Sequence, residues 1–230
     1  MKPTPTQLVL PISTDPDATW QHWVSRQETE LLEHALTDVR SAPPPGVFLW
    51  GEQGLGKSHL LQAVCANLGS EASYIPLSLV SDVPPSALLD GVEDSAAVLI
   101  DDVQLTISSD DWQEGLFHCF NRCVGTGTPL IIASRVAVSS LDGLLPDLKS
   151  RLALLAGFRL PSWEMDAFEL LLIRLAKHRG LILTDEVARY LTRRLRQTPT
   201  EALIAIEQIE RSSLIEQRTP TIPFLKTLGL

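Results

Sequence analysis

The chain has 230 residues, of which 44% are hydrophobic and 20% charged, so it is long enough for one substantial globular domain and a small appendage. Its net charge of −9 argues against a protein that binds mainly by neutralising DNA phosphates. No apolar run approaches the roughly 18 residues that span a bilayer, and no signal-peptide pattern opens the sequence, so we expect a cytoplasmic protein without a membrane partner.

The first residues predict a tail rather than part of a folded core. Residues 1–19 are rich in proline, threonine and aspartate, and they contain one isolated apolar hexamer, Gln7–Ile12 (QLVLPI). Polar flanks broken by prolines indicate an extended segment. We therefore assign 1–15 to a tail and 16–160 to the first folded domain, in which the leucine spacing predicts a helix over Thr29–Val39.

Strand and helix patterns then alternate along the chain. Four short apolar segments predict strands: Val47–Trp50, Tyr74–Leu77, Ala97–Ile100 and Leu130–Ala133. Helical spacing of apolar residues predicts helices over Ser58–Leu68 and Trp112–Val124. Continuously apolar strands separated by helices indicate a parallel sheet that is covered on both faces.

Residues 161–230 predict a small domain made only of helices. Helical patterns cover Met165–His178, Asp185–Arg194 and Pro199–Ile215. Thr198 is the expected N-cap of the third helix, with Glu201 placed to complete a capping box. The expected architecture is therefore an α/β domain with a parallel sheet, followed by a helical lid.

The clearest functional motif follows the first strand. The segment from Gly51 to Ser58 (GEQGLGKS) matches the phosphate-binding pattern G-x-x-x-x-G-K-[ST] between a strand and a helix. Glycines let backbone N–H groups turn toward phosphate oxygens, the lysine reaches the terminal phosphates, and the serine hydroxyl binds Mg²⁺. We expect an ADP or ATP site with Mg²⁺, built from Gly51, Gly54, Gly56, Lys57 and Ser58.

Two acidic residues follow the third predicted strand. We expect Asp101 to hold the Mg²⁺ shell indirectly and Asp102 to orient an attacking water. The alternative is that this pair simply caps a helix, but the phosphate-binding motif earlier in the chain favours the functional interpretation.

Three further segments carry a family resemblance. Asp101–Gln104 (DDVQ), Phe117–Asn121 (FHCFN) and Leu148–Leu152 (LKSRL) resemble the AAA+ domain of the bacterial replication initiator DnaA. The helix-turn-helix domain that follows the lid in DnaA is missing from the 230 residues, and a QLxLPL-type tail precedes the domain. This combination resembles the Hda family, whose members inactivate DnaA. The resemblance implies an AAA+ P-loop NTPase fold with a helical lid and an extended N-terminal tail.

The resemblance also implies two partners. Gln7, Leu8, Leu10, Pro11 and Ile12 match the motif that binds the sliding clamp (beta) of DNA polymerase III, and the alternative is a stray edge strand. DNA would then be reached only through the clamp.

The second implied partner is DnaA. Arg151 matches an arginine finger that acts in trans on DnaA-bound ATP, and the alternative is a surface ion pair. Self-association of the chain is left open.

The base of the nucleotide is the next feature that the resemblance covers. Trp23 and Val24 match the segment that lies over the adenine in relatives, and the alternative is that the tryptophan is part of the core.

Two departures from relatives that hydrolyse ATP well predict weak intrinsic hydrolysis. Ser134 and Arg135 stand where those relatives carry an acidic or polar sensor, and Thr200 stands where they carry a lid arginine, with Arg196 one turn upstream.

The resemblance as a whole implies negative regulation of replication initiation as the function. The alternatives are a free-standing AAA+ ATPase such as a helicase loader, and a clamp-tethered adaptor without catalytic output.

Overall fold

The computed structural model describes residues 15, 17–39, 45–80 and 82–230. Contacts divide the chain into two compact units. The α/β unit comprises Met1–Trp23, Thr29–Gly51 and Lys57–Leu160, and the lid unit comprises Val24–Glu28, Glu52–Gly56 and Pro161–Leu230. The tail segment Gln7–Ile12 lies outside the described residues.

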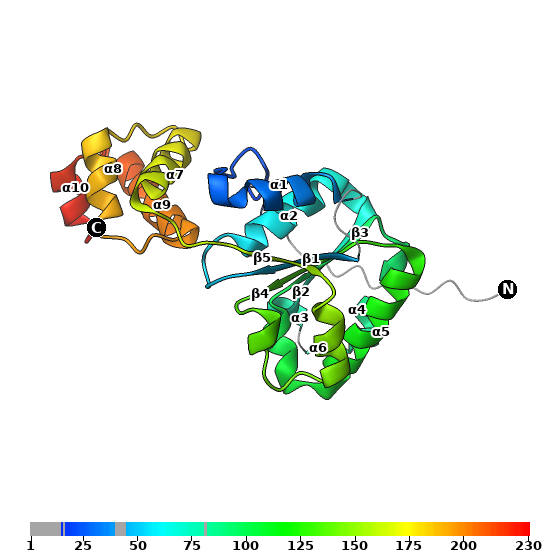
Figure 1. The fold of residues 1–230 in the computed structure, drawn as a ribbon. Helices are drawn as coiled ribbons and strands as arrows, with labels where there is room; N and C mark the ends of the chain where they lie inside the picture. Colours follow the sequence, from blue (N-terminus) through cyan, green and yellow to red (C-terminus); the bar gives the residue numbers. More distant parts are fainter. Residues whose placement is uncertain (1–14, 16, 40–44, 81) are drawn as a thin grey trace. The chain divides into compact units, whose positions relative to one another are not determined.

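The α/β unit is built on a parallel sheet of five strands in the order β2-β3-β4-β1-β5 (Figure 1). The strands are β1 (Gly46–Trp50), β2 (Ala72–Pro76), β3 (Ala97–Asp101), β4 (Leu130–Ser134) and β5 (Ala156–Arg159). The four predicted strands are confirmed, although Leu77 belongs to the next helix. The sequence did not predict β5, because this edge strand alternates between partly buried and exposed residues and offers no continuous apolar run.

Helices cover both faces of this sheet (Figure 1). The helices of the unit are α1 (Glu30–Thr37), α2 (Lys57–Leu68), α3 (Leu77–Val80), α4 (Pro85–Leu89), α5 (Asp110–Thr126) and α6 (Pro146–Leu152). Alternate strand residues such as Phe48, Ile100 and Ile132 pack in one core with side chains of α3 to α6. The intervening residues point to the opposite face, where α2 contacts β2, β3 and β4.

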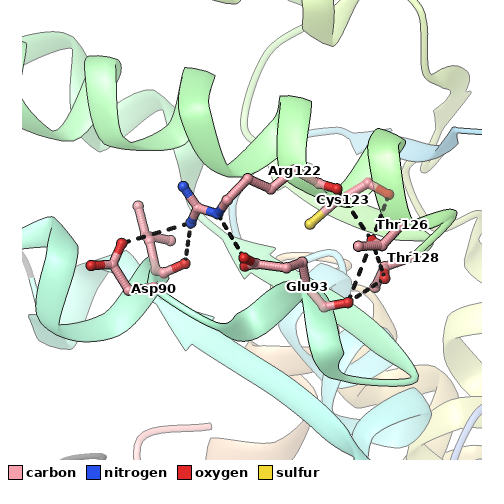
Figure 2. A network of polar contacts seen from close by, with 7 residues as sticks. Asp90, Glu93, Arg122, Cys123, Thr126 and Thr128 are labelled. Carbon is pink, nitrogen blue, oxygen red and sulfur yellow. Dashed lines mark hydrogen bonds and ion pairs between the residues drawn. The ribbon is translucent and has the colours of Figure 1, made fainter. Parts of the chain in front are cut away.

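A polar network holds α5 to the segment that precedes β3 (Figure 2). Arg122 Nε forms an ion pair with Glu93 Oε1 at 3.0 Å, and Arg122 Nη2 lies 3.8 Å from Asp90 Oδ1. The hydroxyl groups of Thr126 and Thr128 donate hydrogen bonds to the Glu93 carbonyl oxygen. The network therefore ties the carboxyl half of α5 to the segment that contains Asp90 and Glu93.

The lid unit contains α7 (Met165–His178), α8 (Asp185–Thr192), α9 (Pro199–Glu216) and α10 (Ile222–Thr227). The first three helices were predicted, and α10 was not. Thr198 caps α9 by accepting a hydrogen bond from the Glu201 N–H, whereas the N–H of Thr198 donates to the Arg196 carbonyl, so only half of the predicted capping box forms. Across the described segments, no helix is both long enough and apolar enough to cross a lipid bilayer.

Candidate functional site

The phosphate-binding motif lies in the turn between β1 and α2. Gly54 has φ +83° and Gly56 has φ +105°, backbone conformations that side chains rarely tolerate. Gly51 ends the strand by donating its N–H to the Ser134 carbonyl at 3.3 Å, and α2 begins at Lys57. The turn therefore has the backbone geometry for which the motif selects glycine, at the amino end of a 12-residue helix.

Lys57 is buried within this turn. The residue as a whole is only 6% exposed, and its Nζ donates a hydrogen bond to the Gly51 carbonyl at 2.7 Å. Burial lowers the pKa of Lys57, while the charges of Asp102 and Asp101 oppose that shift and the charge of Arg135 adds to it. These charged groups come from the carboxyl ends of β3 and β4, so the sheet brings them close to the ammonium group.

Asp101 ends β3 as a buried carboxylate with several donors. The Tyr74 hydroxyl donates to Oδ2 at 3.1 Å, and the backbone N–H of Asp102 donates to Oδ1 at 3.0 Å. Burial raises the pKa of Asp101, and hydrogen bonds from Ser58 and Tyr74 oppose the rise. The structure therefore joins Ser58 to Asp101, a pair of hard oxygen groups that suits Mg²⁺. No cluster of three or more His, Cys, Asp or Glu side chains suited to a metal occurs among the described residues, and Mg²⁺ bound through phosphates and waters does not need one.

Asp102 follows Asp101 in a left-handed backbone conformation, with φ 59°. Its Oδ1 lies 3.3 Å from Arg135 Nε, which comes from the residue directly after β4. We call Lys57, Ser58, Asp101, Asp102 and Arg135 the carboxyl edge. The sequence placed both aspartates at this edge, but it did not predict that Arg135 pairs with one of them.

Trp23 and Val24, the residues expected beside the base, are both buried. The indole Nε1 of Trp23 donates to Glu33 Oε1 at 2.8 Å, and its ring lies 5.9 Å from the His59 ring, measured between centroids. These contacts fix the indole against α1 and α2.

Arg151 lies in α6, whose first turn is fixed by the buried Gln113. The Gln113 Oε1 accepts a hydrogen bond from the Leu145 N–H at 2.6 Å, just before the helix begins. The Arg151 guanidinium carbon lies 5.9 Å from the centroid of the Phe117 ring. In the described part of the chain, no acidic side chain forms an ion pair with Arg151.

An open hollow of about 400 Å³ adjoins this arginine, lined by Pro45, Phe120, Asn121, Val124, Arg151 and Leu154. Two of its lining side chains are exposed apolar groups, since Val124 is 49% and Leu154 is 56% exposed. We call Arg151, Phe117 and this hollow the Arg151 face.

In the lid unit, arginines in α8 and directly after it border a second open hollow of about 400 Å³. The residues that line it are Glu186, Arg189, Tyr190, Arg193, Arg194 and Ile222. Arg189 pairs weakly with Glu169 at 3.7 Å, and the Arg194 guanidinium lies 5.4 Å from the Tyr190 ring centroid. Thr200 and Arg196, the two positions considered for a lid arginine, are both exposed.

Sequence reasoning missed two polar residues that contact the carboxyl edge. Tyr74 was assigned only to a strand, yet its hydroxyl contacts Asp101. Gln104 belongs to the quoted DDVQ segment but received no role, and its side chain contacts Asp102. The parallel register, in which Pro76 pairs with Asp101, could have indicated that Tyr74 lies near the acid.

Two family models match separate parts of the chain. The model described as "Hda, lid domain" matches residues 166–228, and the model of the bacterial DnaA ATPase domain matches residues 85–157. The second match contains Asp101, Asp102 and Arg151.

Solved structures show the same fold. Domain III of DnaA from Thermotoga maritima has a TM-score of 0.81 at 22% identity, covering 94% of this chain and 97% of that one. AMPPCP-bound DnaA from Aquifex aeolicus has a TM-score of 0.72 at 23% identity, covering 88% and 70%. RuvB from Thermotoga maritima, a Holliday junction branch migration motor, has a TM-score of 0.70 at 16% identity, covering 91% and 70%. With its DnaA-type ATPase segment and its Hda-type lid, the chain is an AAA+ protein of the Hda/DnaA-like family.

Proposed function

We propose that the carboxyl edge holds an adenine nucleotide, either ADP or ATP. The turn around Gly54 and Gly56 would present backbone N–H groups to the phosphates, and Lys57 supplies a buried positive charge for them. The proposal is supported by the fold shared with the AMPPCP-bound DnaA of Aquifex aeolicus. In this proposal Trp23 and Val24 border the base.

Mg²⁺ would accompany the nucleotide and offset negative charge on its phosphates. Ser58 would hold the ion directly through its hydroxyl group, and Asp101 would hold it through an intervening water. The hydrogen bond between these two side chains supports their assignment to one ion.

We further propose that the protein is a negative regulator of replication initiation that acts on DnaA-bound ATP. Arg151 would enter the nucleotide site of a neighbouring DnaA molecule as an arginine finger, leaving inactive ADP-bound DnaA. The observation that carries this proposal is the combination at the Arg151 face. A guanidinium group without an acidic partner in the described part of the chain lies on an aromatic ring beside an open hollow.

The chemistry of a guanidinium group fits this role. Its planar set of N–H donors pairs with phosphate oxygens and keeps its charge at all physiological pH values. An arginine finger stabilises the charge that builds up on the transferred phosphoryl group, and it is worth about 10³–10⁵ in rate. Phe117 would hold the side chain extended before the partner arrives, which lowers the entropy lost on binding.

The tail supplies the second contact in this proposal. Gln7, Leu8, Leu10, Pro11 and Ile12 would bind the sliding clamp as an extended segment, with apolar side chains in a surface pocket and the glutamine fixing the register. DNA would be reached only through the clamp, so the acidic character of the chain is no obstacle.

The test follows hydrolysis of radiolabelled ATP bound to DnaA, in the presence of clamp loaded on DNA. Wild-type protein should accelerate hydrolysis, and Arg151→Ala should lose at least about 10²-fold of that acceleration. Arg159→Ala is the matched control, because it removes another arginine that lies over an aromatic ring, 5.5 Å from the Trp50 centroid. Equal acceleration by both variants would contradict the arginine-finger proposal.

The same assay separates the alternatives. A clamp-tethered adaptor would bind the clamp through its tail and leave the ATP on DnaA intact. A free-standing ATPase would hydrolyse ATP by itself and lose that activity with Lys57→Ala.

A further inference from the structure

The Asp102 carboxylate is held from two directions. Gln104 Nε2 donates a hydrogen bond to Asp102 Oδ1 at 2.6 Å, and Arg135 Nε donates to the same oxygen at 3.3 Å. The backbone N–H of Arg135 donates to Gln104 Oε1 at 3.0 Å, which closes the ring of contacts. We call these three residues the Asp102 triangle.

The fold places each member of the triangle by a separate feature. Asp102 turns the chain after β3 with φ 59°, a conformation that few residues other than glycine adopt and that aspartate tolerates. Gln104 lies in the turn that follows, and Arg135 directly follows β4, the strand paired with β3. The contacts therefore join two neighbouring strand ends.

The triangle changes what the Asp102 carboxylate can do. A carboxylate that orients or activates a water must offer an accepting oxygen to that water in the right direction. Here one oxygen already accepts two hydrogen bonds, and the guanidinium group offsets the charge that makes the carboxylate a good acceptor. The side chain of Asp102 is only 19% exposed, so its orientation is also restricted by its surroundings.

We propose that the Asp102 triangle keeps the chain's own ATP from being hydrolysed, with Arg135 and Gln104 as positioning residues that hold the carboxylate away from a water. This inference rests on the proposed nucleotide site and concerns its regulation. It implies that ATP bound at the carboxyl edge stays unhydrolysed while the triangle is intact.

Arg135 also has a second effect, which makes the inference testable. Arg135 directly follows β4 and Lys57 begins α2, and both belong to the carboxyl edge. In the proposed nucleotide site, both cations would lie near the bound phosphates. Loss of Arg135 should weaken nucleotide binding modestly and, at the same time, release Asp102 to act on a water.

The experiment measures binding and hydrolysis separately on the 230-residue chain. A fluorescent ADP analogue reports affinity, and release of phosphate from saturating ATP with MgCl₂ reports hydrolysis in single-turnover conditions. Arg135→Ala should hydrolyse ATP about 10- to 100-fold faster than wild type, within the range for one acid-base group. Arg135→Lys should stay nearer to wild type because it retains the charge. Gln104→Ala should show a smaller increase than Arg135→Ala.

Two controls fix the interpretation. Adding Asp102→Asn to Arg135→Ala should return hydrolysis to background, because the released carboxylate is then absent. Arg159→Ala, at an exposed arginine of β5, should leave hydrolysis unchanged.

The outcomes distinguish this inference from the proposed function. If Arg135→Ala and Gln104→Ala both bind ATP and hydrolyse it no faster than wild type, the triangle has no such role, although the nucleotide site remains. If the wild-type chain binds neither ADP nor ATP, both the nucleotide site and the triangle are overturned.

Discussion

At the carboxyl edge, Lys57 and Asp101 are buried and bonded to groups of the same unit, whereas Arg151 at the Arg151 face contacts a ring and an open hollow. Buried charges need partners, because an unpaired charge in the interior costs several kcal/mol or more. The carboxyl edge is therefore complete within one chain and suits a ligand that stays bound. At the Arg151 face, the guanidinium group has no acidic partner in the described part of the chain, so it can pair with an anionic group of another molecule.

The largest effect on nucleotide binding should come from Lys57→Ala, which removes the buried cation of the carboxyl edge and leaves the Arg151 face unchanged. A hydrogen bond to a charged group contributes about 1.5–3 kcal/mol, so ADP affinity should fall about 10- to 100-fold. Titration with a fluorescent ADP analogue measures this loss. Arg151→Ala, at the Arg151 face, is the control. An equal loss of ADP affinity in that variant would contradict the separation of the two regions.

The next effect concerns the support of the Arg151 face. Arg122→Ala leaves Glu93 without its cation. We expect the free energy of unfolding to fall by only about 1–2 kcal/mol, because the ion pair is partly exposed and water screens it. Thermal unfolding should show a decrease in Tm of about 3–6 °C. Arg218→Ala removes a more exposed ion pair with Glu216 and should change Tm little. A change in ADP affinity with Arg122→Ala would show that the two regions are not independent.

The sequence predicted the carboxyl edge more fully than the Arg151 face. The phosphate-binding turn and both aspartates were found because a local spacing encodes a local backbone shape. The strand β5 and the helix α6 around Arg151 were not predicted, since β5 lacks a long apolar run and α6 has only seven residues. Contacts between strand ends, such as Tyr74 with Asp101, depend on strand order, which no single segment encodes.

A smaller effect should follow Tyr74→Phe, at a residue that contacts the carboxyl edge. This substitution removes the donor to Asp101 Oδ2 and should lower the free energy of unfolding by about 1 kcal/mol, as measured by urea unfolding. Binding of ADP with Mg²⁺ should also weaken, because Asp101 loses a group that orients it. Tyr190→Phe removes a comparable hydroxyl contact in the lid unit, where the donor reaches the Leu230 carbonyl at 3.0 Å, and it should leave ADP binding unchanged.

The smallest effect is a pH dependence of stability that arises from His59 in α2. Burial lowers the pKa of His59 in the folded chain, so the unfolded chain binds more protons near the ordinary value of about 6.5. The free energy of unfolding should therefore decrease as the pH falls from 7.5 to 5.5, by about 1 kcal/mol or less. His59→Gln should flatten this dependence in urea unfolding, and His34→Gln, at an exposed position, should leave it unchanged.

The edge strand β5 connects α6 to β1 through a short stretch of backbone. It begins four positions after the end of α6, pairs along its length with β1, and is followed by Leu160, whose N–H donates to the Trp50 carbonyl at 2.7 Å. A displacement of α6 would reach β1, and the phosphate-binding turn that follows it, through one strip of backbone hydrogen bonds. If the two regions are coupled along this strip, a ligand at the turn and a partner on α6 must change each other's affinity by the same factor.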